Sequence, residues 1–288
     1  MKATILILKE DRPQRTTYIV DVMARHWRAA GHRVIEHFGT KNLPHADVVF
    51  LHVNQTIVPP SYTEAVSKYP KVINGAVLDI SRRRYSMASV GPHERYEGPV
   101  IVKTDKNYGG VPETIRNGGL NYFIKRLHRS KFFNATSRKM TSWSRISFLN
   151  PLEYPVFDSI HDVPETVWKN KNLIVEKFIP ERESDLFFVR FWTFLGRQNL
   201  TGRFGSRHPI VKFNRCVTEM TPVDIPQELV AWRVKLNMDY GRFDFVMNDG
   251  RPVLLDVNKT QATGTLSEWS KKQFFTLSQG LDDFLKDF

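Results

Sequence analysis

The sequence predicts a multidomain protein that begins with a small parallel α/β domain and continues with strand-rich subdomains. The chain has 288 residues, which is more than one small hydrophobic core usually holds. Its first 75 residues alternate short apolar strands with helical segments, the pattern of a parallel α/β domain. Its last third contains a hairpin pattern over residues 240–258, where two apolar strands flank an Asn-Asp-Gly turn.

The N-terminal region contains the strand–helix alternation. The predicted strands are Ala3–Lys9, Arg33–Phe38, Asp47–Val53 and Val72–Asn74. Thr16–Ala30 has helical periodicity and ends before Gly31, and a second helix is predicted over Ser61–Lys68. The apolar face of the first helix consists of Ile19, Val22, Met23, Trp27 and Ala30. The turn at residues 10–15 has no glycine, which excludes a dinucleotide-binding fingerprint after the first strand.

The rest of the chain divides at two places. Gly91-Pro92 and Gly98-Pro99 mark a boundary, and Pro180 closes a strong strand. We therefore predict domains at residues 1–97, 98–180 and 181–288. The predicted strands after the first boundary are Val100–Lys103, Leu173–Ile179, Leu186–Leu195 and Leu200–Phe204. The predicted helical segments are Leu120–Lys131, Pro226–Leu236 and Leu266–Phe288, and Ser130–Asn150 is polar and weakly patterned.

Composition narrows the class of protein. The chain is 41% hydrophobic and 25% charged, as is usual for a soluble globular protein. No apolar run approaches the ~20 residues of a membrane span, and the start is typical of a first strand rather than a signal peptide. The single Cys216 excludes an intramolecular disulfide and any multi-cysteine metal site, so a cytoplasmic protein is expected.

The net charge is 42 − 30 = +12, which suits nucleic acid, an acidic membrane surface or a small polyanion. The densest basic groups are Arg82–Arg84 and Lys125–Lys139. There is no zinc-finger spacing, no RNA-binding aromatic signature and no basic tail, and a small anionic substrate such as a nucleotide explains the charge equally well.

The hairpin carries oxygen ligands at positions that suit a metal. Asp256 and Asn258 are two residues apart on the second strand and so share a face, and pairing brings Asp244 of the first strand near them. Three such oxygens suit Mg²⁺, which shares the rest of its coordination shell with water and phosphate. A surface hairpin with solvated acids is the alternative.

Three further segments carry candidate binding groups. Lys103 ends a strand ahead of Gly109-Gly110, where glycines let backbone N–H groups approach a phosphate, although such a segment is often only a turn. Glu176 and Lys177 lie in an apolar strand whose backbone, if free at a hinge, can hydrogen-bond an adenine edge; a sheet strand bearing solvated charges is the favoured alternative. Arg190 lies in an apolar strand, where an arginine is costly to bury unless it is paired or binds an anion; Arg203 is a weaker case.

The order of these features resembles the ATP-grasp superfamily, and most closely its branch that contains glutathione synthetase, the ribosomal-protein glutamate ligase and D-alanine–D-alanine ligase. The resemblance covers about residues 70–265. It implies an α/β and α+β architecture, in which two α+β subdomains sandwich ATP after a small parallel α/β domain.

The resemblance also implies a role for each candidate. Lys103 is similar to the lysine that holds the ATP phosphates, and the loop that closes over them corresponds to Asn107, Tyr108, Gly109 and Gly110. The hinge that contacts adenine corresponds to Glu176, Lys177, Phe178 and Ile179, and the ribose acid to Glu181 or Glu183. Arg190, with Arg203, resembles the arginine that faces the acyl phosphate. The magnesium ligands correspond to Asp244, Asp256 and Asn258.

The sequence departs from the family pattern in four places. Asp256 stands where glutamate is usual, and Phe188 where an acid often precedes the strand arginine. An earlier lysine is missing, and Arg83 or Arg84 is expected to replace it. The segment Lys259–Gly264 replaces a small-Pro-Gly sequence that usually lines the acceptor pocket, so the acceptor substrate stays open.

The implied activity is an ATP-dependent carboxylate–amine ligase that works through an acyl phosphate and releases ADP and phosphate. The expected cofactors are ATP and one or two Mg²⁺ ions, with Mn²⁺ as an alternative. The expected substrates are a small-molecule or peptide acid and an amine; neither nucleic acid nor membrane is expected, and a homodimer is left open. Two alternatives remain: a phosphotransferase on the same fold, and a protein that binds nucleic acid or another partner through Lys125–Lys139 without turnover.

Overall fold

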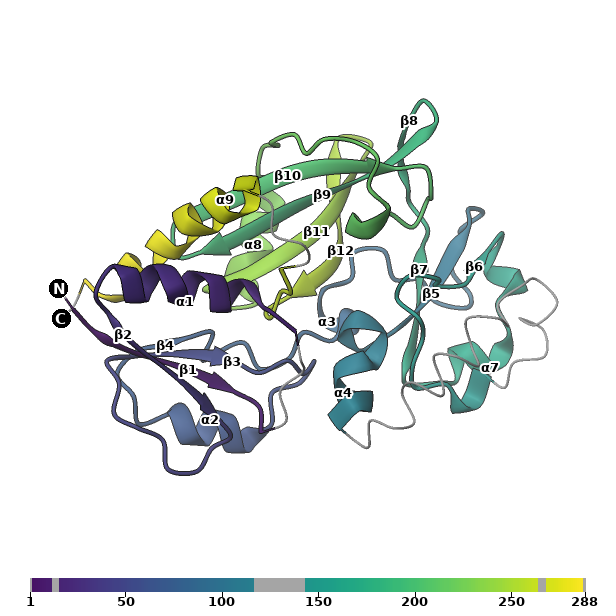
Figure 1. Cartoon of the computed structure of the whole chain (residues 1–288). Coiled ribbons are helices and arrows are strands. Elements are labelled where there is room, and N and C mark those ends of the chain that lie inside the picture. The colour runs from purple at the N-terminus through teal and green to yellow at the C-terminus, as the bar shows by residue number, and fades with distance from the viewer. Residues whose placement is uncertain (1, 12–15, 117–142, 264–267, 287–288) are drawn as a thin grey trace.

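The computed structural model describes residues 2–11, 16–116, 143–263 and 268–286, which form a parallel sheet and two antiparallel sheets with helices packed on them (Figure 1). This combination confirms the predicted α/β and α+β fold class. The predicted helix Leu120–Lys131, the basic segment Lys125–Lys139 and most of Ser130–Asn150 lie outside the described residues. The predicted domain boundaries at residues 97 and 180 stay predictions.

The N-terminal sheet is parallel, with the strand order β2-β1-β3-β4. Its strands are β1 (Thr4–Lys9), β2 (Arg33–Phe38), β3 (Val48–His52) and β4 (Val72–Ile73). Helix α1 (Ile19–Ala29) packs on one face and α2 (Pro60–Val66) on the other (Figure 1). Because strand side chains alternate, Ile5 and Phe50 face α1, whereas Leu6 and Leu51 face α2.

The middle sheet is small and antiparallel, with the order β6-β5-β7. Its strands are β5 (Val100–Thr104), β6 (Val156–Phe157) and β7 (Leu173–Lys177). The short helices around it are η1 (Asn107–Gly110), α4 (Val111–Arg116), η2 (Trp143–Arg145), η3 (Ile160–Asp162) and α7 (Glu165–Trp168). Helix α3 (Arg82–Tyr85) lies in the connection from the N-terminal sheet to β5.

The large sheet is antiparallel, with the order β10-β9-β11-β12 and β8 paired to β9. Its strands are β8 (Glu181–Glu183), β9 (Leu186–Leu195), β10 (Gln198–Ser206), β11 (Tyr240–Asn248) and β12 (Arg251–Asn258). The remaining helices are η4 (Phe213–Arg215), α8 (Gln227–Lys235), α9 (Glu268–Ser278) and η5 (Gln279–Phe284). One face of this sheet packs against α1 and α9. The other face carries a cluster rich in aromatic side chains, and α8 packs on this cluster.

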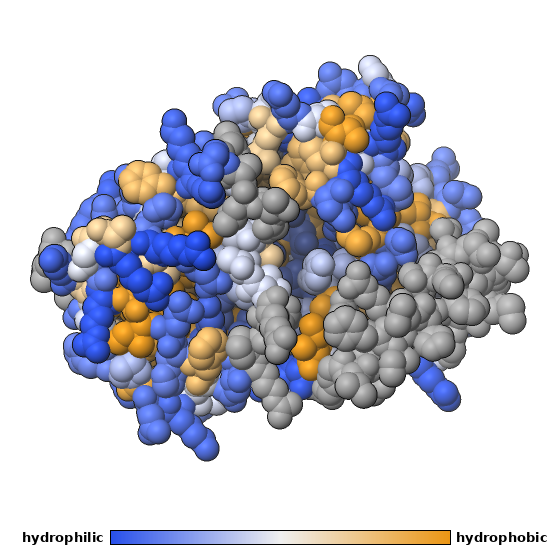
Figure 2. Space-filling view, viewed as in Figure 1, coloured by the Kyte–Doolittle hydropathy of each residue, from blue (hydrophilic) through white to orange (hydrophobic). Residues whose placement is uncertain are grey.

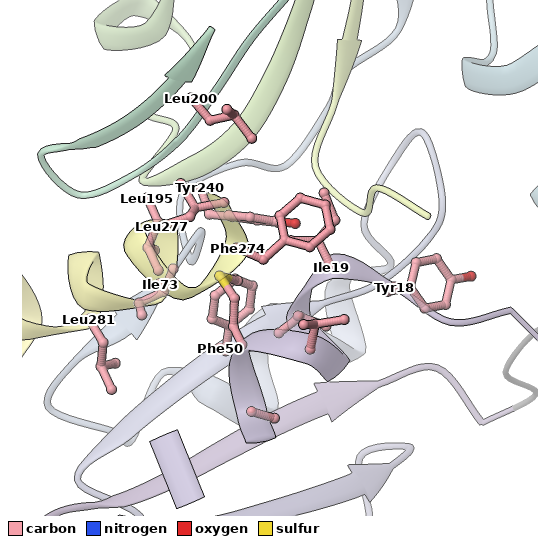
Figure 3. Close-up of a cluster of buried hydrophobic side chains, with 14 of the residues drawn as sticks. Tyr18, Ile19, Phe50, Ile73, Leu195, Leu200, Tyr240, Phe274, Leu277 and Leu281 are labelled. Carbon is pink, nitrogen blue, oxygen red and sulfur yellow. The ribbon is translucent and has the colours of Figure 1, made fainter. Parts of the chain in front are cut away.

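A shared core joins the N-terminal sheet to the large sheet. Figure 3 shows Phe50 of β3 and Ile73 of β4 beside Leu195 and Tyr240 of the large sheet, with Phe274 and Leu277 of α9 between them. The Phe50 and Tyr240 rings meet edge to face at 5.0 Å. The two sheets are therefore held together by burial as well as by chain connection.

Asn74 reinforces this junction. Its side chain donates to the carbonyl oxygen of Tyr240 (2.8 Å) and accepts from the backbone N–H groups of Asp239 (3.1 Å) and Tyr240 (3.0 Å). Its own N–H donates to the Asp239 carboxylate (2.7 Å). Asn74 has a φ of 60°, a conformation that asparagine tolerates better than most residues.

We expect Asn74→Ala to lower the free energy of unfolding by about 2–4 kcal/mol, because three hydrogen bonds are lost and buried backbone groups are left unpaired. Thermal and denaturant unfolding measure the change. Asn42→Ala is the matched control, because Asn42 is exposed and also has a positive φ of 53°. Equal losses in the two variants would contradict the role of the Asn74 side chain.

Candidate active site

The predicted hairpin is present. Asp249 and Gly250 connect β11 to β12 with φ values of 48° and 76°, as a two-residue hairpin turn requires. The register pairs Asp244 directly with Asp256, so the two carboxylates lie side by side on one face of the large sheet. Asn258 follows two residues after Asp256 and therefore points to the same face.

Asp256 is the centre of a small hydrogen-bond network. Its Oδ1 accepts from Nη2 of Arg82 (3.1 Å), the hydroxyl of Tyr85 (3.2 Å) and the backbone N–H of Val257 (3.1 Å). Burial lowers the pKa of the Arg82 guanidinium, but Asp256, Tyr85, Tyr154 and Glu176 together outweigh burial and hold the pKa above its usual value. Arg82 therefore stays charged beside the carboxylate pair.

The structure brings Arg82 to this network rather than Arg83 or Arg84. The Arg84 side chain is 61% exposed and forms an ion pair with Asp79 at 3.6 Å. Helix α3 is a single turn, in which Arg82 and Tyr85 are three residues apart and share its buried face. The i,i+3 spacing of arginine and tyrosine was the sequence signal for this choice.

Lys103 and Glu176 meet across the β5–β7 pair. Nζ of Lys103 lies 2.6 Å from Oε2 of Glu176 in an ion pair, and both residues are buried. Burial raises the pKa of Glu176, but the charges of Lys103 and Arg82 outweigh it and hold the pKa below its usual value. A hydrogen bond with the Ser86 side chain also lowers this pKa, so the Glu176 carboxylate interacts with Ser86 as well as with Lys103.

Lys212 supplies a further cation that the sequence did not indicate. It lies in the connection between β10 and α8 and is partly buried. Burial lowers its pKa, aided by Lys103 and Arg82, while Asp256 and Asp244 act in the opposite direction. Asp244, Asp256, Lys103 and Arg82 are therefore within electrostatic range of Lys212. No periodicity or motif marks this residue.

The glycine loop has a constrained backbone. Tyr108, Gly109 and Gly110 have positive φ values of 45°, 69° and 78°. A Cβ on Gly109 would lie 2.1 Å from the backbone oxygen of Leu149, so only glycine fits there. The N–H of Asn107 donates to Oγ1 of Thr56 (2.9 Å), which connects the loop to the N-terminal domain.

Two backbone N–H groups of the predicted hinge already form hydrogen bonds within the protein. The N–H groups of Lys177 and Phe178 donate to the carbonyl oxygens of Ala88 (2.7 Å) and Pro99 (2.8 Å). The ammonium of Lys177 lies outside this ladder, over the ring of Tyr96 at 5.2 Å. Within the described residues the N–H of Ile179 takes part in no such bond, which leaves it able to bind a ligand.

Arg190 and Arg203 are not brought to the carboxylate pair. They pair with each other across β9 and β10, and Arg190 also pairs with Phe245 of β11. Because Asp244 is the residue before Phe245, Arg190 and Asp244 lie on opposite faces of the sheet.

Glu181 binds both of these arginines. It accepts from Nε and Nη2 of Arg190 (2.9 Å each) and from the N–H of Met247 (2.9 Å), and Nε of Arg203 lies 3.1 Å away. The exposed Glu183 accepts from Nη2 of Arg203 (2.6 Å). Glu181 is therefore saturated by the protein, and Glu183 is the more accessible of the two acids predicted to contact ribose.

Arg242, rather than Arg190, lies beside Asp244. It is two residues before Asp244 on β11, pairs with Asn258 across the hairpin, and donates from Nε to Asp244 Oδ1 (2.7 Å). Its guanidinium also stacks on the ring of Phe191 at 4.3 Å. The sequence signal was the i,i+2 spacing of arginine and aspartate on one strand.

The site thus combines two carboxylates and an amide on one face of the large sheet with Arg82 and Arg242 in contact with the carboxylates, and Lys103 and Lys212 lie within electrostatic range. Figure 2 shows a recess with hydrophilic residues near the middle of the molecule, where β12 and α3 lie in Figure 1. The described residues contain no cluster of three or more His, Cys, Asp or Glu side chains placed to hold a metal. Any metal at the hairpin would therefore rely on Asn258 and on bound phosphate as well as on the two aspartates.

Comparisons at the level of sequence identify no relative of this chain. No family model and no curated protein sequence matches it. Among the described residues, no helix combines the length and the hydropathy needed to cross a membrane.

Solved structures do match along the full length. A D-cycloserine synthetase matches at TM-score 0.54 and 14% identity, over 98% of this chain and all of that chain (100%). An ATP-grasp ligase from Chryseobacterium gregarium, associated with ribosomally made peptides and in complex with ADP and a leader and core peptide, matches at 0.51 and 10%, over 98% and 97%. D-alanine–D-alanine ligase from Bacillus anthracis matches at 0.50 and 11%, over 99% and 97%. Together with the sheet topology, these matches show that the chain has the ATP-grasp fold.

Proposed function

We propose that the protein is an ATP- and Mg²⁺-dependent carboxylate–amine ligase. The observation that carries the proposal is the carboxylate pair Asp244 and Asp256 on the large sheet of an ATP-grasp fold, with Arg82 bonded to Asp256 and with Lys103 and Lys212 within electrostatic range. A set of cations beside paired carboxylates suits a metal-bound polyphosphate, because each part neutralises charge on the other.

The residues present fit the nucleotide and the metal. Asp244, Asp256 and Asn258 would hold Mg²⁺, which when bound neutralises charge on the phosphates and polarises the transferring phosphoryl group. The buried carboxylate of Glu176 would accept from the exocyclic amino group of adenine in addition to its interactions with Lys103 and Ser86. The free N–H of Ile179 suits a ring nitrogen of the same base.

The remaining cations would bind the phosphates. Lys103, Arg82 and Lys212 supply positive charge, and the loop Asn107–Gly110 supplies backbone N–H groups close to its glycines. We assign the arginine that stabilises the acyl phosphate to Arg242, since it shares the face of Asp244. Arg190 and Arg203 are assigned to the structural network of Glu181.

The proposed reaction has two steps, phosphoryl transfer to the acid and then amide formation. A carboxylate oxygen of the acid attacks the γ-phosphorus of ATP, the bond to the β-phosphate oxygen breaks, and ADP leaves. The amine nitrogen then attacks the acyl carbon, the carbon–oxygen bond to phosphate breaks, and inorganic phosphate and one proton are released. The cations near Asp244 and Asp256 are placed to stabilise the negative charge that develops in both steps.

The test is a screen of acid–amine pairs for ADP and phosphate release. We expect turnover that needs ATP, Mg²⁺, an acid and an amine together, with one ADP and one phosphate for each amide formed. AMP and pyrophosphate would contradict the acyl-phosphate mechanism. A phosphorylated product without free phosphate would instead identify a phosphotransferase.

The glycine loop offers a separate prediction. We expect Gly109→Ala to weaken nucleotide binding about tenfold, since a side chain at this positive φ costs about 1–2 kcal/mol and would meet the Leu149 backbone. Titration calorimetry with a non-hydrolysable ATP analogue measures the affinity. Gly250→Ala is the control, because Gly250 also has positive φ but has open space around it. Unchanged affinity in Gly109→Ala would argue against phosphate binding by this loop.

A further inference from the structure

Thr56 joins three segments that lie around the proposed phosphate site. It belongs to the connection between β3 and α2 and is only 2% exposed. Its Oγ1 accepts from the N–H of Asn107 (2.9 Å), its N–H donates to Oε1 of Glu113 (2.8 Å), and its carbonyl oxygen accepts from the N–H of Ile80 (3.0 Å). Its three polar groups therefore hold the glycine loop, helix α4 and the residues that lead into α3.

The residues that lead into α3 are also fixed to the end of β5. The N–H of Arg82 donates to the carbonyl oxygen of Asp105 (2.9 Å), and the N–H of Arg83 donates to the Asp105 carboxylate (2.9 Å). Asp105 directly follows β5 and lies two residues before Asn107. Figure 1 shows α3 and α4 between the N-terminal sheet and the middle sheet. Arg82 and the glycine loop, both assigned to the phosphates, are thus held in one hydrogen-bond network with Thr56.

The glycine loop has a backbone that depends on such support. Tyr108 has a φ of 45°, which is unfavourable for a residue with a side chain and persists only where the surroundings fix it. On one side of the loop, the carbonyl oxygen of Gly109 accepts from the N–H of Leu149 (3.1 Å). On the other side, the hydroxyl of Thr56 holds the buried N–H of Asn107. The N-terminal domain therefore contributes to the conformation of the loop.

We propose that Thr56 is a positioning residue whose hydroxyl holds the glycine loop in the conformation that binds the nucleotide phosphates. This inference rests on the proposed function, in which the loop binds phosphate. A loop that is already fixed in its binding conformation loses less conformational entropy when the ligand arrives. Thr56 acts on the phosphates through the N–H of Asn107, so its removal weakens the binding of ATP and leaves the binding of adenosine unchanged.

The experiment compares the wild type with Thr56→Val, which keeps the shape of the side chain and both backbone hydrogen bonds and removes the hydroxyl. We expect the affinity for a non-hydrolysable ATP analogue with Mg²⁺ to fall about tenfold, whereas the stabilisation by adenosine stays that of the wild type. Thr56→Ser restores the hydroxyl and should restore the affinity. Calorimetric titration measures the analogue, and the unfolding temperature at increasing concentrations measures adenosine.

Hydrogen exchange tests the loop without any ligand. We expect peptides that contain residues 107–110 to exchange faster in Thr56→Val than in the wild type or Thr56→Ser. Thr218→Val is the matched control, because Oγ1 of Thr218 also accepts from a backbone N–H, that of Gly205 on β10 (2.8 Å). It should lower stability while the exchange of the loop and the affinity for the analogue stay those of the wild type.

The proposal is overturned if loop exchange in Thr56→Val equals that of the wild type, or if Thr218→Val weakens the analogue equally. An equal loss of affinity for adenosine and for the analogue would also overturn it, because a general structural defect would then explain both. If the analogue binds none of the proteins, the proposed function fails and the nucleotide is removed from the proposal. Faster exchange in Thr56→Val alone would in that case still show that Thr56 positions the loop.

Discussion

Asp256→Asn is expected to abolish Mg²⁺-dependent turnover while the protein stays folded. Removing one of two carboxylates from the hairpin weakens metal binding and leaves the phosphoryl charge less neutralised, a loss of several kcal/mol that corresponds to about 10²–10⁴-fold in kcat/KM. Asparagine keeps an acceptor oxygen for Arg82, Tyr85 and the N–H of Val257, so we expect these hydrogen bonds to be retained. ADP release and the thermal shift with a non-hydrolysable ATP analogue, each with and without Mg²⁺, measure the effect.

The control for this variant lies in the same hairpin. Asp249 is an exposed acid in the turn, so Asp249→Asn makes the same chemical change away from the carboxylate pair. We expect wild-type turnover and a wild-type thermal shift from it. A Mg²⁺-dependent shift of normal size in Asp256→Asn would show that the hairpin does not hold the metal.

Arg242→Met is expected to lower kcat about 10²–10³-fold, the usual cost of removing a donor aimed at charge that develops during reaction. Arg242 lies beside Asp244 on the face of the carboxylate pair, and methionine retains the apolar contact with Phe191. Single-turnover measurement of ADP formation separates this step from substrate binding. The unfolding temperature should change little, because the Arg242–Asp244 pair is partly exposed.

Arg190→Met provides the comparison that decides between the two arginines. Arg190 binds Glu181 on the opposite face of the sheet, so we expect lower stability with kcat within several-fold of the wild type. The sequence alone favoured Arg190, and the geometry favours Arg242. A folded Arg190→Met protein with the low kcat expected of Arg242→Met would refute the argument from the sheet face.

Local sequence patterns were sufficient to predict the hairpin and the lysine of β5. Asp256 and Asn258 share a face because side chains alternate along any strand. The Asn-Asp-Gly turn fixes the pairing only as far as Phe245 with Leu254, and an irregularity between Asp244 and Phe245 then shifts the register by one residue and pairs Asp244 with Asp256. The face of the sheet on which Arg190 lies could not be predicted in this way. A shift of one residue moves a strand side chain to the other face of a sheet, and no local signal shows which face of a strand with apolar residues on both sides holds the ligand.

The sequence by itself determined the parallel N-terminal domain and the carboxylate-bearing hairpin, because both follow from short-range periodicity and turn chemistry. The ATP-grasp fold was expected from the resemblance of the order of motifs to that superfamily. Only the tertiary structure decided which arginines contact Asp244 and Asp256, that Lys212 lies within electrostatic range of both, and that Lys259 is buried. These depend on contacts between segments more than 40 residues apart, such as Arg82 with Asp256 and Asn54 with Thr260. No local preference encodes such contacts, since packing of the whole chain sets them.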